Sequence, residues 1–442
     1  MSDPGQQHYS PVRMLVLSWG PSIHAWRRIR IFENDSDFSV TVASTHDFGF
    51  ERAKNVLLHD ARRNRQGETS PEGIDIGRGS RKEKSLLFEK VKVFLARFTL
   101  ALLLYDFVKG ITDAVILWKA VRKCRPQIIF LQTLMYPCYL AFLLPKSIPI
   151  VITFWNGDVT WWAESNGIER VFKKNLVTYG VRRAKALTVN SIVARNACLG
   201  YGVSSNKVHL IRYPGVDRER FKPLAKADAK SALDIDAGKV ILCPRGIGGY
   251  LNSDVIVESA ADVVKKIPDV LFLFFSGAGS GEMLRQHQER VKQLGIERNF
   301  RWSGQVPWER MPVYYNASDL MVSISSNDSL PNCMMEALAC GTPVIMGDIP
   351  QIREWIADGQ NGFLVPPGDP GELSRKILEV LALLPDRIGR ITDTGQELVA
   401  REFDSSINTV SVKDLVRRIV GNNRGENRGT MPHGGEEGIR RS

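Results

Sequence analysis

The sequence predicts an α/β protein built from two parallel β-sheets, each in a domain of its own. Short apolar runs of Val, Ile, Leu and Phe recur along the 442 residues, and such runs are typical of strands buried on both faces. The stretch 317–347 shows the strand–loop–helix–strand order that produces parallel neighbours. An Ala-, Lys- and Asp-rich stretch at 214–238 interrupts the pattern, so we expect it to be the linker between the domains.

The first domain is expected to span residues 1–213. Apolar runs predict its strands at 12–18, 38–43, 127–131, 148–154, 184–190 and 207–212. Residues 46–85 are polar, charged and glycine-rich without a clear period, which predicts an insertion or a mobile loop. Residues 86–108 are apolar with interspersed Lys and Arg. This pattern fits either a core helix with one wet face or a helix on a membrane surface.

The second domain is expected to span residues 239–398. Further apolar runs predict its strands at 240–243, 270–277, 300–304, 320–324 and 344–346. Residues 399–420 are expected to form a C-terminal helix. Residues 421–442 have no apolar period and are expected to be disordered.

The stretch 317–347 predicts a ligand site. The polar residues 325–329 form a loop at the end of its strand, and Pro331 fits the first position of the following helix. Gly341 fits the left-handed residue that ends this helix. The loop and the helix N-terminus thus lie at the carboxyl edge of the sheet, where open α/β sheets bind ligands. Free N–H groups and the helix dipole favour an anion such as a phosphate there.

Two carboxylates belong to this edge: Asp328 lies in the loop and Glu336 follows about one turn into the helix. One can face a ligand beside the helix tip while the other grips it further along, although an ordinary helix start could carry the same two acids. Together with the words ALACGTPVI that follow, the spacing resembles the E-x7-E signature of the retaining glycosyltransferase family 4. Asp328 stands at the position of the first Glu.

The resemblance implies a GT-B fold, in which two Rossmann-like domains with parallel sheets face a central cleft. It implies transfer of a sugar from a nucleotide-diphosphate sugar to an acceptor hydroxyl, with retention at the anomeric carbon. In the family the first acid contacts the donor sugar, which implies a catalytic role for Asp328, and the second bonds the ribose, which implies donor binding by Glu336. The resemblance also implies donor binding by the residues at the helix start, Ser329, Leu330, Pro331 and Asn332. Related folds return their last helix to the first domain.

Arg245, just past the strand 240–243, resembles the family arginine that binds the donor diphosphate. The lysine that usually follows five or six residues later is absent, and Tyr250, Leu251 and then Asn252 stand there. Some family branches carry a tyrosine–asparagine pair at this place, which makes Asn252 a donor-binding candidate. Arg245 and the helix tip would neutralise the phosphates, so no metal cofactor is expected. A formal D-x-D at 234–236 lies in the linker and is expected to be solvated.

The first domain adds three candidates. Gly20 follows the first strand, where the family usually has a Gly-rich loop that approaches the diphosphate. His24, in the helix after it, acts either at an acceptor site or as a structural residue. Trp155 to Asp158 (WNGD) resembles a short H/W-G-x-D motif of the cleft between the domains. Asp158 would orient the acceptor hydroxyl, or alternatively it closes a local turn.

Charge is divided unevenly along the chain. Residues 1–213 hold 31 Lys and Arg against 17 Asp and Glu, whereas residues 214–442 hold 28 against 31. A basic first half indicates an anionic partner, or else a solvated basic face. An anionic membrane or a glycan or lipid-linked acceptor with a phosphate fits better than nucleic acid, for which no recognition motif is present.

The compartment is expected to be the cytoplasm, with peripheral attachment to the inner face of the membrane. Six cysteines show no CxxC pair or metal-ligand spacing, which fits a reducing compartment. The polar N-terminus lacks the basic-then-apolar order of a signal peptide.

Three functions remain open. The first is a glycosyltransferase in glycan, polysaccharide or glycolipid synthesis. The second is a nucleotide-sugar epimerase of the same architecture, against which the signature in the second domain argues. The third is an inactive GT-B partner subunit that binds a nucleotide sugar or a glycan, for which the short Asp328 and the missing lysine argue.

Overall fold

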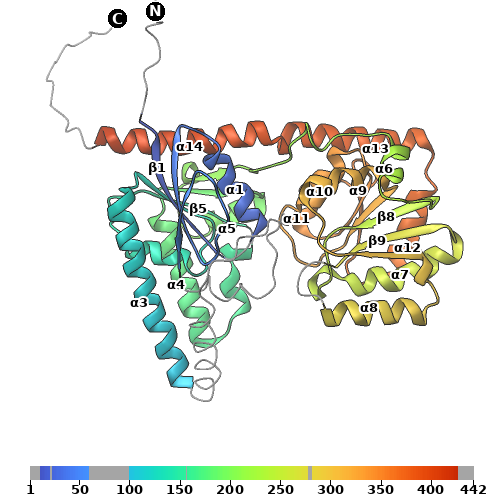
Figure 1. Ribbon diagram of the computed structural model, residues 1–442, viewed down its shortest axis with the longest axis horizontal. Helices are drawn as coiled ribbons and strands as arrows, with labels where there is room; N and C mark the ends of the chain where they lie inside the picture. The colour runs from blue at the N-terminus through green and yellow to red at the C-terminus, as the bar shows by residue number, and fades with distance from the viewer. Residues whose placement is uncertain (1–9, 20–21, 59–98, 156, 277–280, 427–442) are drawn as a thin grey trace, which may run out of the picture.

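The computed structural model describes residues 10–19, 22–58, 99–155, 157–276 and 281–426, and it consists of two α/β domains (Figure 1). The first sheet has the strand order β3-β2-β1-β4-β5-β6-β7 and the second β10-β9-β8-β11-β12-β13. Every strand pair in both sheets is parallel. The expected α/β class with two parallel sheets is thus confirmed. None of the helices in the described ranges is long and apolar enough to cross a membrane.

The first domain places its apolar strands in the middle of three layers. Its strands are β1 (Val12–Ser18), β2 (Phe38–Ser44), β3 (Lys54–Leu57), β4 (Ile128–Leu131), β5 (Ile150–Thr153), β6 (Ala186–Val189) and β7 (Val208–Leu210). The helices α3 (Thr99–Cys124), α4 (Gly167–Arg183) and α5 (Ile192–Leu199) cover one face. The other face is covered by α1 (Ile23–Glu33) and by α14 (Ser405–Glu426), the last helix of the chain. Figure 1 shows α14 lying over this domain.

The second domain repeats this three-layer arrangement. Its strands are β8 (Lys239–Cys243), β9 (Val270–Phe275), β10 (Phe300–Ser303), β11 (Leu320–Ser323), β12 (Val344–Gly347) and β13 (Phe363–Val365). One face carries α9 (Met311–Ala317), α10 (Asn332–Ala339) and α11 (Pro350–Arg353). The other carries α7 (Ser253–Lys266), α8 (Gly281–Gln293) and α12 (Pro370–Leu381). The helix α13 (Pro385–Leu398) packs against α10, while its Ile391 joins the core on the α7 face.

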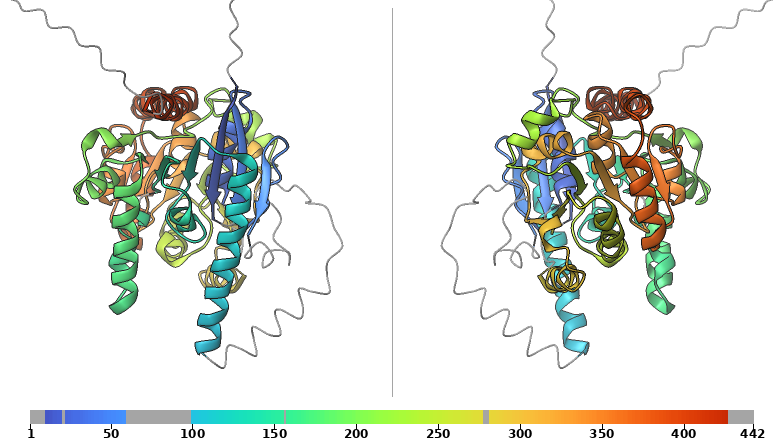
Figure 2. Two further views of the ribbon diagram at one scale, coloured as in Figure 1. Left: turned by 90° about the vertical axis from the view of Figure 1, so that its left-hand side faces the viewer. Right: turned by 90° about the vertical axis from the view of Figure 1, so that its right-hand side faces the viewer.

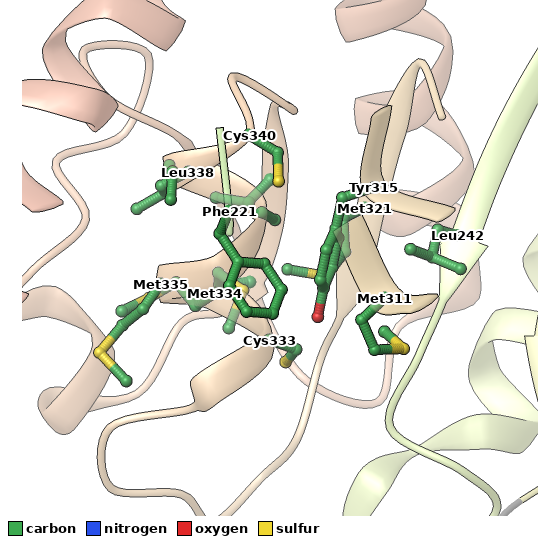
Figure 3. Close-up of a cluster of buried hydrophobic side chains, with 14 of the residues drawn as sticks. Phe221, Leu242, Met311, Tyr315, Met321, Cys333, Met334, Met335, Leu338 and Cys340 are labelled. Carbon is green, nitrogen blue, oxygen red and sulfur yellow. The ribbon is translucent and has the colours of Figure 1, made fainter. Parts of the chain in front are cut away.

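The core under α10 is rich in sulfur. Cys333, Met334 and Met335 of α10 pack with Met311 and Met321 in one buried cluster (Figure 3). Methionine adapts its shape to irregular space, so this cluster can accept the bulky Tyr315 ring and the linker residue Phe221. The packing fixes α10 against the sheet and so fixes the direction in which its N-terminus points.

The linker holds more structure than a simple hinge. Residues 226–231 form the short helix α6 (Lys226–Ser231), and Val216 forms a β-bridge with Asp404 just before α14. The chain therefore crosses between the domains twice at the same place. Gly341 has φ +72°, as expected at the end of α10. The helix begins at Asn332, so Pro331 is its N-cap residue rather than its first helical residue as expected.

The structure corrects or extends three expectations about elements. The strand β3 forms at the edge of the first sheet, within the stretch expected to be an insertion, because its backbone bonds to β2 although most of its side chains remain exposed. Within the described residues, α3 starts at Thr99 and continues past residue 108 to Cys124, because Leu117 and Val121 pack against the sheet. The last helix continues to Glu426 rather than ending at 420. Residues 86–98 and 427–442 lie outside the described ranges.

Candidate active site between the domains

The carboxyl edges of the two sheets meet, and polar side chains bond across the junction. His24 Nδ1 of the first domain lies 3.0 Å from Asn332 Nδ2 at the start of α10. Ser329 Oγ donates to Asn190 Oδ1, just after β6, at 2.8 Å. Four residues that the sequence predicted for the site, His24, Ser329, Asn332 and Glu336, are therefore brought together at one interface between the domains.

Arg245 and Asp328 form an ion pair within the second domain. Arg245 follows β8 and Asp328 lies in the loop after β11, and Arg245 Nη1 lies 2.8 Å from Asp328 Oδ2. The two side chains keep 24% and 13% of their surface exposed, so a ligand can reach both. Burial, the largest single effect, disfavours the charge on Arg245, but Asp328 together with smaller contributions from Cys333 and Tyr250 raises the pKa of the guanidinium. Arg245 is thus a permanent cation beside the N-terminus of α10.

Glu336 lies deeper than a surface ligand group would. Its Oε1 accepts from Arg27 Nη1 at 3.1 Å and from Trp308 Nε1 at 3.0 Å, and its Oε2 accepts from Tyr315 OH at 3.1 Å. Burial and the neighbouring Glu336 raise the pKa of Tyr315 well above its usual range, so its hydroxyl remains protonated and donates. The carboxylate is nearly enclosed, with 5% of its side chain exposed.

Arg27 makes this cluster a contact between domains. It belongs to α1 of the first domain, and its side chain is 8% exposed. Its Nη2 donates to the carbonyl of Gly215 in the linker at 3.0 Å, and its guanidinium lies 4.7 Å from the centre of the Trp308 ring. One arginine therefore connects the first domain, the linker and Glu336, the acid predicted to bind the ribose.

His24 is uncharged in this environment. Part of the residue remains exposed, but the surrounding protein removes much of the water around the ring, and this desolvation is the main cause that lowers its pKa. The positive charges of Arg28, Arg27 and Arg245 lower it further, to about 3. With the Asn332 amide donating to Nδ1, the proton of the neutral ring lies on Nε2. His24 can therefore donate a hydrogen bond from Nε2 at physiological pH.

Asp158 is held inside the first domain. Its Oδ1 accepts from the backbone N–H of Trp155 at 2.8 Å, and its Oδ2 accepts from Thr133 Oγ1 at 3.1 Å. The side chain fastens the turn after β5, which is the structural alternative given above, and the residue is only 6% exposed. It contributes a negative charge near Arg28, whose pKa it raises against a larger lowering by burial.

Unpartnered polar atoms lie around the carboxyl edge of the first sheet. Among the described residues, Arg28 Nη1, Trp155 Nε1 and Ser18 Oγ are buried without a hydrogen-bond partner. The Arg28 guanidinium lies 5.2 Å from the centre of the Trp155 ring, so at least these two groups are neighbours. Buried polar atoms are rarely left unpaired, and such atoms at a sheet edge indicate a place where a polar ligand or water is bound.

The remaining predicted residues shape the loop. Asn252 adopts a left-handed conformation at φ +51°, and its Nδ2 donates to the carbonyl of Ile324 at 2.7 Å, so it supports the strand end. Leu330 packs against the buried cluster under α10, and Pro331 caps that helix. Gly20 lies outside the described residues.

Sequence reasoning gave no role to Arg27 or Arg28, and it missed Trp308 and Tyr315. One signal was available for the arginines. They follow His24 by three and four residues, so all three share one face of α1. No comparable local signal marks the two aromatic donors. Within the described part of the chain, no group of three or more His, Cys, Asp or Glu is arranged to hold a metal ion.

Comparison with known proteins assigns both halves of the chain. The model of "Glycosyltransferase Family 4" matches residues 78–220, and that of "Glycosyl transferases group 1" matches residues 226–390. A D-inositol 3-phosphate glycosyltransferase of Catenulispora acidiphila is 29% identical over 50% of this chain and 52% of its own. One from Geodermatophilus obscurus is 33% identical over 46% of each chain. The chain thus spans about half the length of the curated relatives it matches.

Solved structures share the fold at low identity. A glycosyltransferase from Rickettsia africae superposes with a TM-score of 0.67 at 17% identity, covering 94% of this chain and all of that one. HepE from Anabaena, solved in complex with UDP, gives a TM-score of 0.68 at 15% identity over 92% of this chain and all of that one. The two family matches together span more than half of the sequence, and the chain therefore belongs to glycosyltransferase family 4 and has the GT-B fold.

Proposed function

We propose that this protein transfers a sugar from a nucleotide-diphosphate sugar to an acceptor hydroxyl with retention at the anomeric carbon. The observation that carries the proposal is the Arg245–Asp328 pair beside the N-terminus of α10, at the junction of the two sheet edges. A cation, a carboxylate and free helix N–H groups there meet the needs of a diphosphate attached to a sugar.

In this proposal Arg245 and the first N–H groups of α10 bind the diphosphate, so no metal ion is required for charge neutralisation. Asp328 then leaves its ion pair with Arg245 and contacts the sugar instead. The sugar ring gains positive character as its bond to phosphate breaks, and a carboxylate beside it stabilises the transition state more than the ground state.

For the nucleotide part of the donor to bind, the ribose hydroxyls have to replace Arg27 as hydrogen-bond donors to Glu336. Three donors already hold the carboxylate, one of them from the other domain. For Glu336 to accept ribose hydroxyls, Arg27 has to withdraw, which couples nucleotide binding to the relation between the domains. UDP is a suitable probe because the structurally similar HepE was solved with it.

The acceptor is proposed to bind at the edge of the first sheet. His24 can donate from Nε2, and Arg28 Nη1 is buried without a partner among the described residues. A guanidinium in this position suits an acceptor with a phosphate near its hydroxyl, a class that includes glycans or lipids linked through phosphate. The proposed setting is polysaccharide or glycolipid synthesis at the inner face of a membrane.

The test is release of UDP from UDP-sugars, measured with and without phosphate-bearing acceptors and with anionic vesicles present. Acceptor-dependent release, with the anomeric configuration of the product followed by NMR, supports the proposal. A product of inverted configuration contradicts retention. The comparison variant is Asp328→Asn, which should bind UDP as the parent does but cleave UDP from the UDP-sugar slowly.

A second candidate is an inactive partner subunit that binds the nucleotide sugar without turnover. The ion pair between Arg27 and Glu336 favours it, because this contact blocks the carboxylate that would otherwise bind the ribose. UDP binding by calorimetry without UDP release from any donor would support this candidate over the transferase.

A further inference from the structure

A groove of about 880 Å³ lies on the first domain, between the second half of α3 and the 3-10 helix η2 (Cys138–Leu143). Its apolar side chains are unusually open: Ile111 is 51% exposed, Val115 48% and Leu143 59%. Trp118 adds an indole ring that is 39% exposed. A cluster of large apolar side chains at the surface of a folded domain indicates a binding surface.

The rim of the groove is basic. Lys109, Lys119 and Arg122 line it together with the apolar residues, and among the described lining residues there is no Asp or Glu. Lys109 Nζ lies 5.0 Å from the centre of the Tyr136 ring, and the Arg122 guanidinium lies 5.6 Å from that of Trp118. Aromatic rings next to basic groups are the combination found where proteins meet lipid headgroups.

The same character continues onto α4. η2 contacts both α3 and α4, and the rings of Phe142 and Tyr179 meet edge to face at 5.2 Å. At the N-terminal end of α4, Ile168 is 89% exposed and Phe172 58%, and Lys174 lies between them and Tyr179 on the same helix. Figures 1 and 2 show α3 and α4 extending on the side of the domain away from α14.

We infer that the α3–η2 groove, together with the exposed face of α4, docks the protein on an anionic lipid bilayer. The apolar floor enters the interface between headgroups and acyl chains, and Lys119 and Arg122 of the rim pair with lipid phosphates. This complementarity agrees with the excess of 31 basic over 17 acidic residues in residues 1–213. The inference deepens the proposed function by placing the acceptor site beside a membrane, and in that respect it rests on the proposed function.

The experiment measures sedimentation of the full chain with vesicles and needs no turnover, so the two proposals can fail separately. We expect binding to vesicles of phosphatidylcholine with 30% phosphatidylglycerol, release by salt, and little binding to pure phosphatidylcholine, with 30% being roughly the anionic content that gives a strong surface potential. Lys119→Glu with Arg122→Glu should weaken binding by about tenfold or more, because both charges are reversed near the headgroups.

Ile111→Ser with Val115→Ser tests the apolar floor without changing charge and should also weaken binding by about tenfold, since apolar burial contributes to interfacial binding. The matched control is Ile407→Ser with Val410→Ser on α14, two residues 56% and 57% exposed. It should bind as the parent does. Equal binding to neutral vesicles, loss of binding in the α14 control, or concentration-dependent dimerisation through the groove would overturn the inference.

Discussion

Two arginine–carboxylate pairs meet at the site, and they differ in depth and in what they join. Arg245 and Asp328 belong to one domain and keep 24% and 13% of their side chains exposed. Arg27 and Glu336 come from different domains and keep 8% and 5%. Two acids eight residues apart would bind one ligand side by side if spacing alone decided. The structure instead places one where a ligand can reach it and the other in a contact between domains.

The difference has an energetic consequence. A partly exposed pair loses little when it separates, because water screens both charges. A buried pair that loses one member leaves a charge without compensation, which costs several kcal/mol. Asp328 can therefore exchange partners during a reaction cycle at low cost, whereas Glu336 can do so only if a ligand replaces Arg27 with equally good hydrogen bonds.

The largest effect is expected from Arg27→Met. It leaves Glu336 buried with only neutral donors, and we expect the free energy of unfolding to fall by ~3–5 kcal/mol. Urea unfolding followed by fluorescence measures this change. Arg27→Met combined with Glu336→Gln should recover part of the loss, because the uncompensated charge is then removed.

The matched control is Arg220→Met. The Arg220 guanidinium lies 4.5 Å from the same Trp308 ring, but its side chain is 37% exposed and its nearest acid, on Glu309, is 3.8 Å away. Its loss should cost about 1 kcal/mol or less. If the two variants lose stability equally, the buried pair has no special weight.

Glu336→Gln should weaken UDP binding by ~10- to 150-fold, or ~1.5–3 kcal/mol, because a ribose hydroxyl then meets an amide in place of a full charge. Calorimetry measures the affinity, with Glu309→Gln as an exposed control. An unchanged affinity would assign Glu336 to the contact between the domains alone. Arg27→Met, which removes the competitor for Glu336, should bind UDP at least as tightly as the parent.

Asp328→Asn should separate binding from turnover. We expect kcat to fall by about 10- to 100-fold, or ~1.4–2.8 kcal/mol in the barrier, since the charge acts mainly in the transition state. UDP affinity should stay level or rise, because Arg245 loses its competing carboxylate. Arg245→Ala, in contrast, should lower UDP affinity, and Asp328→Glu should retain activity. Equal losses of UDP affinity in Asp328→Asn and Arg245→Ala would contradict this separation.

The smallest effect concerns His24 and pH, because the residue is partly exposed and solvent screens the charges around its ring. Its folded-state pKa of about 3 lies below the unfolded value of 6.5, so in acid the unfolded chain takes up a proton at His24 that the folded chain refuses. His24 therefore costs the folded state nothing above pH 6.5, and the free energy of unfolding decreases as pH falls from 6.5 toward 3. Between pH 7 and 4.5 the urea midpoint of the parent should therefore fall more than that of His24→Gln. Parallel curves would show that His24 titrates normally.

The sequence by itself determined the central strands of both sheets and the neighbourhood of the site, but not the edge strands β3 and β13. The run 12–18 coincides with β1 at Val12–Ser18, and Gly341 ends α10 in the left-handed conformation as expected. Such features depend on periodicity and backbone preference within a few residues, which a single sequence carries. The D-x7-E spacing and the position of Arg245 after a strand likewise located the edge where His24, Ser329 and Asn332 meet.

Only the tertiary structure decided how the acids are used. Arg27 and Glu336 are separated by 309 positions, and no local pattern encodes that pair. It depends on how α1 of one domain packs against α10 of the other, and on the side chains of Trp308 and Tyr315, which enter the cluster from a third segment. The docking groove has the same origin, because α3 and η2 become a surface only when both pack on one sheet face. Charge and burial are properties of the folded neighbourhood, so residues that a motif treats alike acquire different roles there.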